Sequence, residues 1–257
     1  MAEFDRPTVA AGAGSAAVVD QGLRSYMLRV YNYMGVGLVV TGLVAYFAYA
    51  AATTTDAANA VAQVGSGVYL TSFGAAIYTS PLMWVLVLAP LAFVMVLSFG
   101  INKMSAGAAQ LTFWAFAAVM GLSMSSIFLT YTGTSIAKVF FISAATFGAM
   151  SLYGYTTKRD LSGFGSFLFM GLIGIIIASL VNIWLASSGL SFAISIIGVL
   201  IFVGLTAYDT QRIKLSYSES YGADVLRKGA IMGALSLYLD FINLFMMLLR
   251  LTGNQRS

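Results

Sequence analysis

Two aspartates lie inside long apolar stretches of this sequence, and they are the residues best placed to do chemistry. Asp209 lies near the end of V-G-L-T-A-Y-D-T-Q-R-I-K, and Asp240 lies near the middle of residues 229–250. The other seven of the nine acidic residues lie in predicted tails and loops. A carboxylate at mid-membrane depth costs about 2.5–3.5 kcal/mol on insertion scales, so such a residue normally faces protein or water. The two aspartates are therefore a candidate functional site.

A pair of membrane carboxylates can respond to pH. Two carboxylates within hydrogen-bonding distance cannot easily both be ionised, and they titrate as a coupled unit. When deprotonated, the pair attracts a cation, and its oxygen ligands suit a hard ion such as calcium. We therefore predict Asp209 and Asp240 as a pH sensor on an ion pathway and as transient calcium ligands. The alternative is structural: Asp209 pairs with Arg212 one turn further on, and Asp240 hydrogen bonds to a neighbouring helix.

Asp240 belongs to a polar stripe on a predicted helix. Gly233, Ser236, Asp240, Asn243 and Met247 fall at spacings of three and four residues, which places them on one helix face. Gly233, Ser236 and Asn243 are therefore candidate pore-lining residues. The opposite face carries Leu, Ile and Phe, and we expect it to turn outward.

Two basic residues could offer a counter-charge to the acids. Lys103 ends the second apolar run on the same side as Asp209, where it could hold a pore mouth shut. Arg212 is the second candidate, because it lies one helical turn from Asp209. Alternatively, Lys103 is an ordinary anchor at the membrane interface.

Composition places these residues in a multi-pass membrane protein. The chain is 60% hydrophobic and only 9% charged, whereas a soluble domain carries about 25% charged residues. Seven apolar runs, each predicted to be a transmembrane helix, lie near residues 28–52, 81–101, 108–131, 136–156, 164–186, 190–211 and 229–250. We predict a flexible cytoplasmic tail over 1–25 and a seven-helix domain over 26–252. The lipid bilayer is the expected partner.

The missing residue types limit the chemistry. The chain has neither Cys nor His, which removes thiolate chemistry, the usual neutral-pH proton carrier and the commonest metal ligand. Presenilin-like aspartyl proteases also use two intramembrane aspartates, but their Gly-x-Gly-Asp and Pro-Ala-Leu motifs do not occur around Asp240. We expect that the protein has no enzymatic activity and no cofactor, and that calcium is only a permeant ion.

Basic residues indicate the orientation. With the amino terminus in the cytoplasm, ten Lys and Arg fall in inner segments and three in outer segments. If the seventh run were a re-entrant hairpin, the count would be twelve against one, so charge alone leaves both topologies open. The net charge of +4 reflects these membrane-edge positions rather than binding of nucleic acid.

The depths of the two acids present a difficulty. If the seventh run enters the membrane near Gly229, Asp240 lies roughly 16 Å deep, whereas Asp209, close to Arg212, lies only about 5 Å deep. The acids meet if the basic residues after Asp209 snorkel, so that the sixth run extends further inward. They also meet if the seventh run starts in an inner vestibule.

Two motifs resemble those of a known family. Ala-Tyr-Asp-Thr-Gln at 207–211 and A-L-S-L-Y-L-D-F-I-N-L-F at 234–245 look like the signature of the Bax inhibitor-1 family, also called the transmembrane Bax inhibitor motif family. Y-G-Y-T-T-K-R-D-L at 153–161 resembles its prokaryotic branch, which implies a bacterial inner membrane. The resemblance runs from about residue 24 to residue 252.

The resemblance implies both a fold and a function. The implied fold has seven transmembrane helices, the last central and wrapped by the other six. The implied function is a pH-sensitive calcium leak controlled by an aspartate pair that matches Asp209 and Asp240. In related proteins a basic residue at the inner end of the second helix pairs with the first aspartate, and Lys103 is the match here. The alternative is a non-conducting regulator that binds a membrane protease or a stress-response partner.

Overall fold

Seven helices in the computed structural model are long and apolar enough to cross a membrane. The structure describes residues 10–56, 60–65 and 68–256. Within them the candidate spans are Gln21–Ala52, Leu82–Lys103, Ala106–Thr130, Gly133–Thr156, Ser162–Leu185, Ser188–Leu215 and Ala223–Thr252. Each overlaps one of the seven apolar runs. The predicted all-α, seven-span architecture is confirmed.

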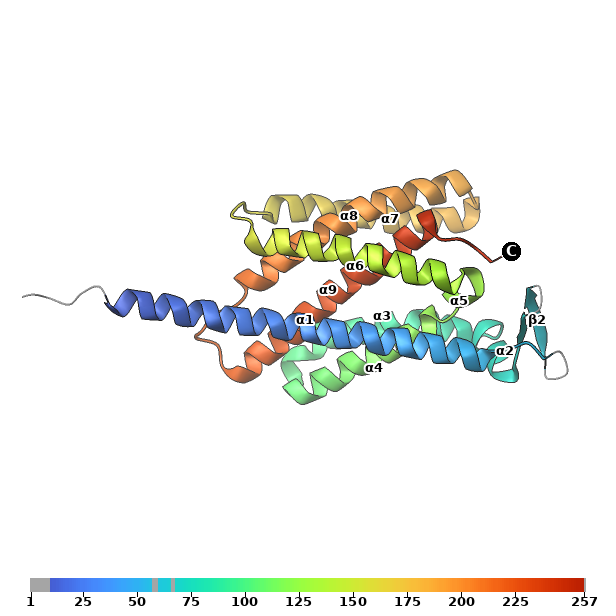
Figure 1. The fold of residues 1–257 in the computed structure, drawn as a ribbon, viewed down its shortest axis with the longest axis horizontal. Coiled ribbons are helices and arrows are strands. Elements are labelled where there is room, and N and C mark those ends of the chain that lie inside the picture. Colours follow the sequence, from blue (N-terminus) through green and yellow to red (C-terminus); the bar gives the residue numbers. More distant parts are fainter. Residues whose placement is uncertain (1–9, 57–59, 66–67, 257) are drawn as a thin grey trace, which may run out of the picture.

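These spans are formed by seven long helices and several short elements (Figure 1). The long helices are α1 (Ala10–Ala52), α3 (Leu82–Gly100), α4 (Ala106–Met124), α6 (Gly133–Thr156), α7 (Ser162–Leu185), α8 (Ser188–Leu215) and α9 (Ala223–Thr252). The short helices are α2 (Ser72–Tyr78), the 3₁₀ turn η2 (Ile101–Lys103) and α5 (Ile127–Thr130). Ser105, Thr132 and Ser187 cap α4, α6 and α8, because each hydroxyl accepts a hydrogen bond from a first-turn amide.

Helix α9 runs diagonally through the centre of the bundle (Figure 1). It contacts α1, α3, α4, α6 and α8, while α7 packs against α8. Of its most apolar window, 61% is buried, against 11% for α3. Leu235 and Leu249, on the apolar side of α9, are as buried as Asp240. The expectation that this side turns outward is therefore wrong, because neighbouring helices cover it instead of lipid.

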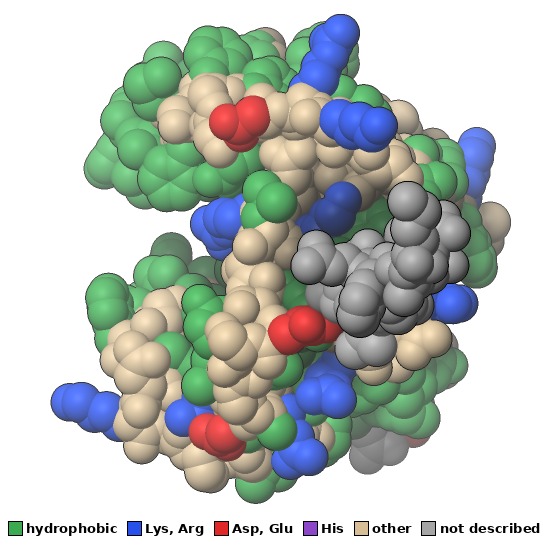
Figure 2. Space-filling view, turned by 90° about the vertical axis from the view of Figure 1, so that its left-hand side faces the viewer, with side chains coloured by type: hydrophobic (Ala, Val, Ile, Leu, Met, Phe, Trp, Pro, Cys, Tyr) green, Lys and Arg blue, Asp and Glu red, His purple; other side chains and the backbone are tan. Residues whose placement is uncertain are grey.

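The two ends of the bundle differ in charge. Lys and Arg side chains gather on the end at which α1 begins (Figure 2). We call this the basic end; it carries the 158–159 connection, the last turn of α8 and the first turns of α9. The carboxyl terminus lies at the opposite end (Figure 1). Because α9 is one unbroken helix of 30 residues, about 45 Å long, the structure favours a full crossing over a re-entrant hairpin.

The amino-terminal region is more regular than expected. Helix α1 begins at Ala10, so residues 10–25 of the expected flexible tail are helical, while residues 1–9 lie outside the described residues. The alanines of A-A-G-A-G-S-A-A-V-V explain this helix, since alanine has the highest intrinsic helix propensity.

A small sheet follows α1 at the opposite end. Strands β1 (Thr53–Thr54), β2 (Ala62–Gly65) and β3 (Val68–Leu70) pair antiparallel in the order β1-β3-β2. The sequence did not predict this sheet, because strands of two to four residues are too short to show an alternating pattern.

Candidate functional site

Helices α8 and α9 run antiparallel and in close contact, and their register brings the candidate residues together. Small residues allow this approach. A Cβ added at Gly233 would lie 3.1 Å from Cγ2 of Ile213, and one added at Gly198 would lie 2.9 Å from Cγ of Met247. The polar stripe of α9 therefore faces α8 rather than lipid.

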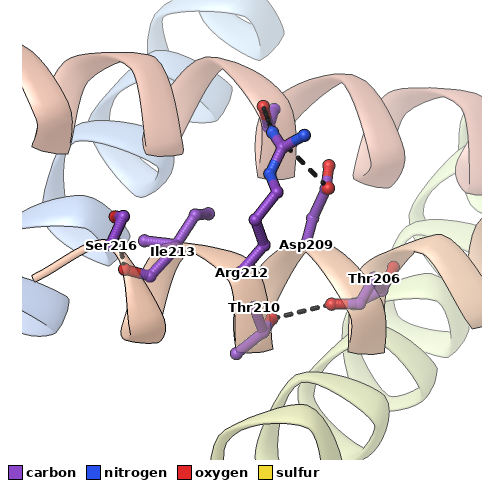
Figure 3. Close-up of polar contacts among 7 residues, drawn as sticks. Thr206, Asp209, Thr210, Arg212, Ile213 and Ser216 are labelled. Carbon is purple, nitrogen blue, oxygen red and sulfur yellow. Dashed lines mark hydrogen bonds and ion pairs between the residues drawn. The ribbon is translucent and has the colours of Figure 1, made fainter. Parts of the chain in front are cut away.

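This register places Asp209 and Asp240 next to each other. Their carboxyl groups are close enough for their charges to interact, and Arg212 contacts both Asp209 and Ser236, one turn before Asp240. The side chain of Asp209 is 13% exposed and Asp240 is 5% exposed. Asp209 points from α8 toward α9, whereas Thr210 points to the other side of α8 (Figure 3). The two acids that the sequence singled out thus share one buried location.

The expected difference in depth disappears because both helices extend beyond their apolar runs. Helix α8 continues to Leu215, and α9 begins at Ala223 rather than near Gly229. Asp240 therefore lies about 25 Å from the start of α9, and Asp209 about 9 Å from the end of α8. The first turns of α9 extend past the end of α8, which compensates for this offset. The depths estimated from the sequence assumed that α8 ends and α9 begins at the same level of the membrane, and they were therefore too far apart.

Arg212 is the basic residue that contacts the pair. Its Nη2 lies 3.6 Å from Oδ1 of Asp209 and donates a 3.4 Å hydrogen bond to Oγ of Ser236. Its guanidinium also lies over the ring of Tyr208, 5.9 Å from the centroid. Lys103 is exposed in η2 and forms no ion pair with any described residue. The structure thus brings Arg212, and not Lys103, to the acids.

A cavity of about 240 Å³ lies at the basic end between α1, α8 and α9. Its lining includes Gly233, Ser236 and Arg212, two of which were predicted as pore-lining residues. The third, Asn243, lies about a turn beyond Asp240, where its Nδ2 donates to the carbonyl oxygen of Leu239. The cavity therefore approaches the aspartate pair from the basic end.

Buried hydroxyl contacts hold the two site helices in place. The Tyr238 hydroxyl lies 2.6 Å from Oγ1 of Thr41 in α1, which donates to the carbonyl oxygen of Ala117 in α4. The hydroxyl of Ser151 in α6 bridges Tyr31 of α1 (2.6 Å) and Thr210 of α8 (3.0 Å). These pairings could not be predicted from the sequence, because tertiary packing alone decides which hydroxyls meet.

Gln211, next to Thr210, fixes the connection between α6 and α7. Its Nε2 donates to the carbonyl oxygen of Arg159 (2.7 Å), and its Oε1 accepts from the amide of Leu161 (2.9 Å). Asp160, two residues before the start of α7, accepts hydrogen bonds from Ser162, and these bonds lower the pKa of its exposed carboxyl. The buried amide of Gln211 therefore ties α8 to a loop that lies 50 residues earlier.

The site does not resemble a resident metal centre. Among the residues that the structure describes, no three His, Cys, Asp or Glu side chains cluster in a way that could hold a metal ion. Calcium takes six to eight oxygen ligands, so two carboxylates would supply only part of its coordination and water the rest.

Known proteins resemble the chain over nearly its full length. The family model described as inhibitor of apoptosis-promoting Bax1 matches residues 23–257. The inner membrane protein YbhL of Escherichia coli is 50% identical over 239 residues, covering 91% of this chain and 94% of YbhL. A protein of Rickettsia prowazekii is 48% identical, covering 93% of each chain, and one of Caulobacter vibrioides is 45% identical, covering 93% and 92%. The chain belongs to the Bax inhibitor-1 family of integral membrane proteins.

Proposed function

We propose that this protein is a pH-sensitive cation leak, with calcium as the permeant ion, in which the Asp209–Asp240 pair controls passage. One observation carries the proposal: the two acids inside the apolar runs, though 31 positions apart in the sequence, meet between α8 and α9. Such costly groups are retained in spans chiefly where ions or protons pass. The positive-inside rule places the basic end in the cytoplasm.

A shared proton gives the pair two states. An ionised carboxylate only accepts hydrogen bonds, so two carboxylates can bond to each other only when one carries a proton. Oδ2 of Asp240 is buried and has no donor among the described groups. With a proton shared, the pair satisfies this oxygen and holds α8 against α9. Loss of the proton leaves two like charges that repel each other and attract a cation.

The direct test is calcium flux into liposomes that contain only the purified protein. We expect flux above that of protein-free liposomes, rising as the pH is raised, because deprotonation opens and charges the pair. Liposomes with the protein but no flux at any pH would contradict a leak. If crosslinking in native membranes then captured a stoichiometric partner, the protein would be a non-conducting regulator instead.

An aromatic cluster lies on the side of the pair away from the basic end. Phe241 of α9 packs edge-to-face on Phe140 and Phe147 of α6, with centroids 5.4 and 5.6 Å apart, and Phe245 packs on Phe140 at 6.3 Å. In the proposed pathway these rings would form an aromatic constriction, which blocks hydrated ions by excluding water.

Phe241→Ala is expected to raise the basal leak. The smaller side chain would open the constriction to water while leaving both aspartates in place, so flux should increase several-fold at every pH and keep its pH dependence. The same liposome assay measures both quantities. Phe141→Ala is the matched control, because Phe141 is 70% exposed on the neighbouring helix α6. Equal flux in the two variants would show that the cluster is not the seal.

A further inference from the structure

The guanidinium of Arg212 stands between two cavities at the basic end. Each cavity measures about 240 Å³. The first is also lined by Ser162 and Tyr208, and the second by Tyr26 and Ser236, while Arg212 and Ser216 line both. A water molecule occupies about 30 Å³ in the liquid. Each cavity therefore has room for a group much larger than one water molecule.

The guanidinium of Arg212 makes only long polar contacts, although it lies close to Asp209. The polar contacts of Arg212 with Asp209 and Ser236 use the same nitrogen, and their lengths of 3.6 and 3.4 Å exceed the usual 2.7–3.2 Å. Within the described part of the chain, its Nε and Nη1 have no hydrogen-bond acceptor. The side chain is 56% exposed. Most of its five N–H donors are thus available to a ligand.

The surroundings of these free donors suit a phosphate group. A guanidinium presents two parallel N–H groups that match two phosphate oxygens. Ser162, Ser236 and Tyr26 line the same cavities, and their hydroxyls can donate to further oxygens. No carboxylate lines either cavity, so an anion entering them meets donors and one positive charge.

The depth of Arg212 points to a lipid as the source of the phosphate. It lies three residues before the end of α8, about 5 Å from that end, and arginines near the end of a membrane span extend toward the lipid headgroups. Lys158, Arg159, Lys214 and Lys228 belong to the same edge of the bundle. Basic residues at a cytoplasmic membrane edge each attract anionic lipid by about 1 kcal/mol. The edge would thus concentrate anionic headgroups beside the cavities.

We propose that Arg212, with the hydroxyls around it, forms a binding site for the phosphate of an anionic lipid headgroup. A phosphate bound there would draw the guanidinium away from Asp209, because it offers shorter and better aligned acceptors than the present 3.6 Å contact. Asp209 would then lose its counter-charge. This last consequence, control of the aspartate pair by lipid, rests on the proposed function; the binding site itself does not.

The test compares lipid binding by full-length variants and involves no flux. Arg212→Gln and Arg227→Gln each remove one arginine charge from an exposed position at the basic end, but Arg227 lines neither cavity. Native mass spectrometry of protein released from phosphatidylglycerol or phosphatidylcholine membranes would count the lipids retained. We expect Arg212→Gln to weaken retention of phosphatidylglycerol about tenfold, as loss of a charged hydrogen-bonded contact does, and Arg227→Gln to change it less than twofold.

Two further arms identify the ligand. Ser236→Ala, which keeps every charge, should weaken phosphatidylglycerol retention by a smaller factor in the same direction. Millimolar inorganic phosphate that displaces the lipid from wild type, but has no effect on Arg212→Gln, would support the same site with a soluble source. Equal losses in the Arg212 and Arg227 variants, or equal retention of phosphatidylcholine and phosphatidylglycerol by wild type, would overturn the proposal.

Discussion

Replacing Asp240 with Asn is expected to abolish the pH dependence of calcium flux. Asparagine has nearly the same shape and can donate a permanent hydrogen bond to Asp209, so α8 and α9 should stay together at every pH. With one acid removed, deprotonation no longer creates two like charges. We therefore expect a low flux that is the same from acidic to basic pH, measured in liposomes loaded with a calcium-sensitive dye.

An acid on the same helix provides the control for this experiment. Asp224 lies in the first turn of α9, where it is exposed and pairs with Lys228 at 3.1 Å. Asp224→Asn removes the same charge but leaves the aspartate pair intact, so it should keep the pH profile of wild type. Asp209→Asn should behave like Asp240→Asn. A pH profile of Asp240→Asn that matches wild type would remove the proposed mechanism.

Replacing Gly154 with Ala is expected to cause the largest loss of stability. Gly154 lies where α6 crosses α8, and a Cβ there would overlap the backbone carbonyl oxygen of Ala207. A backbone atom cannot move aside as a flexible side chain can, so the helices must separate. Overpacking costs about 1–3 kcal/mol, and we expect the upper end of this range. Thermal unfolding in detergent, followed by circular dichroism, measures the loss.

The same helix offers a matched control for this variant. Gly148 lies two turns earlier in α6, and a Cβ there would meet nothing within 4 Å. Gly148→Ala should therefore leave the melting temperature unchanged or raise it slightly, because alanine favours the helix over glycine. Because Ala207 lies two residues before Asp209, the Gly154 variant should also disturb the aspartate pair. Equal melting temperatures of the two variants would contradict the close crossing.

The sequence determined the spans and the unusual acids within them. Seven apolar runs of span length predict seven helices, because each run must satisfy its backbone groups internally in lipid. Asp209 and Asp240 could also be identified from the sequence, because acidic residues are rare in such apolar runs. The polar stripe through Gly233 and Ser236 correctly marked the face of α9 that packs on α8.

The tertiary structure decided which of these residues meet. Local sequence fixes neither how far α9 starts beyond the end of α8 nor which helix covers its apolar side, and both depend on the packing of small residues across the interface. The choice of Arg212 over Lys103 has the same origin. Both residues are basic and lie near the same membrane edge. Only Arg212 shares a helix with Asp209 and faces α9, and it lies one helical turn from Asp209, close enough for an ion pair.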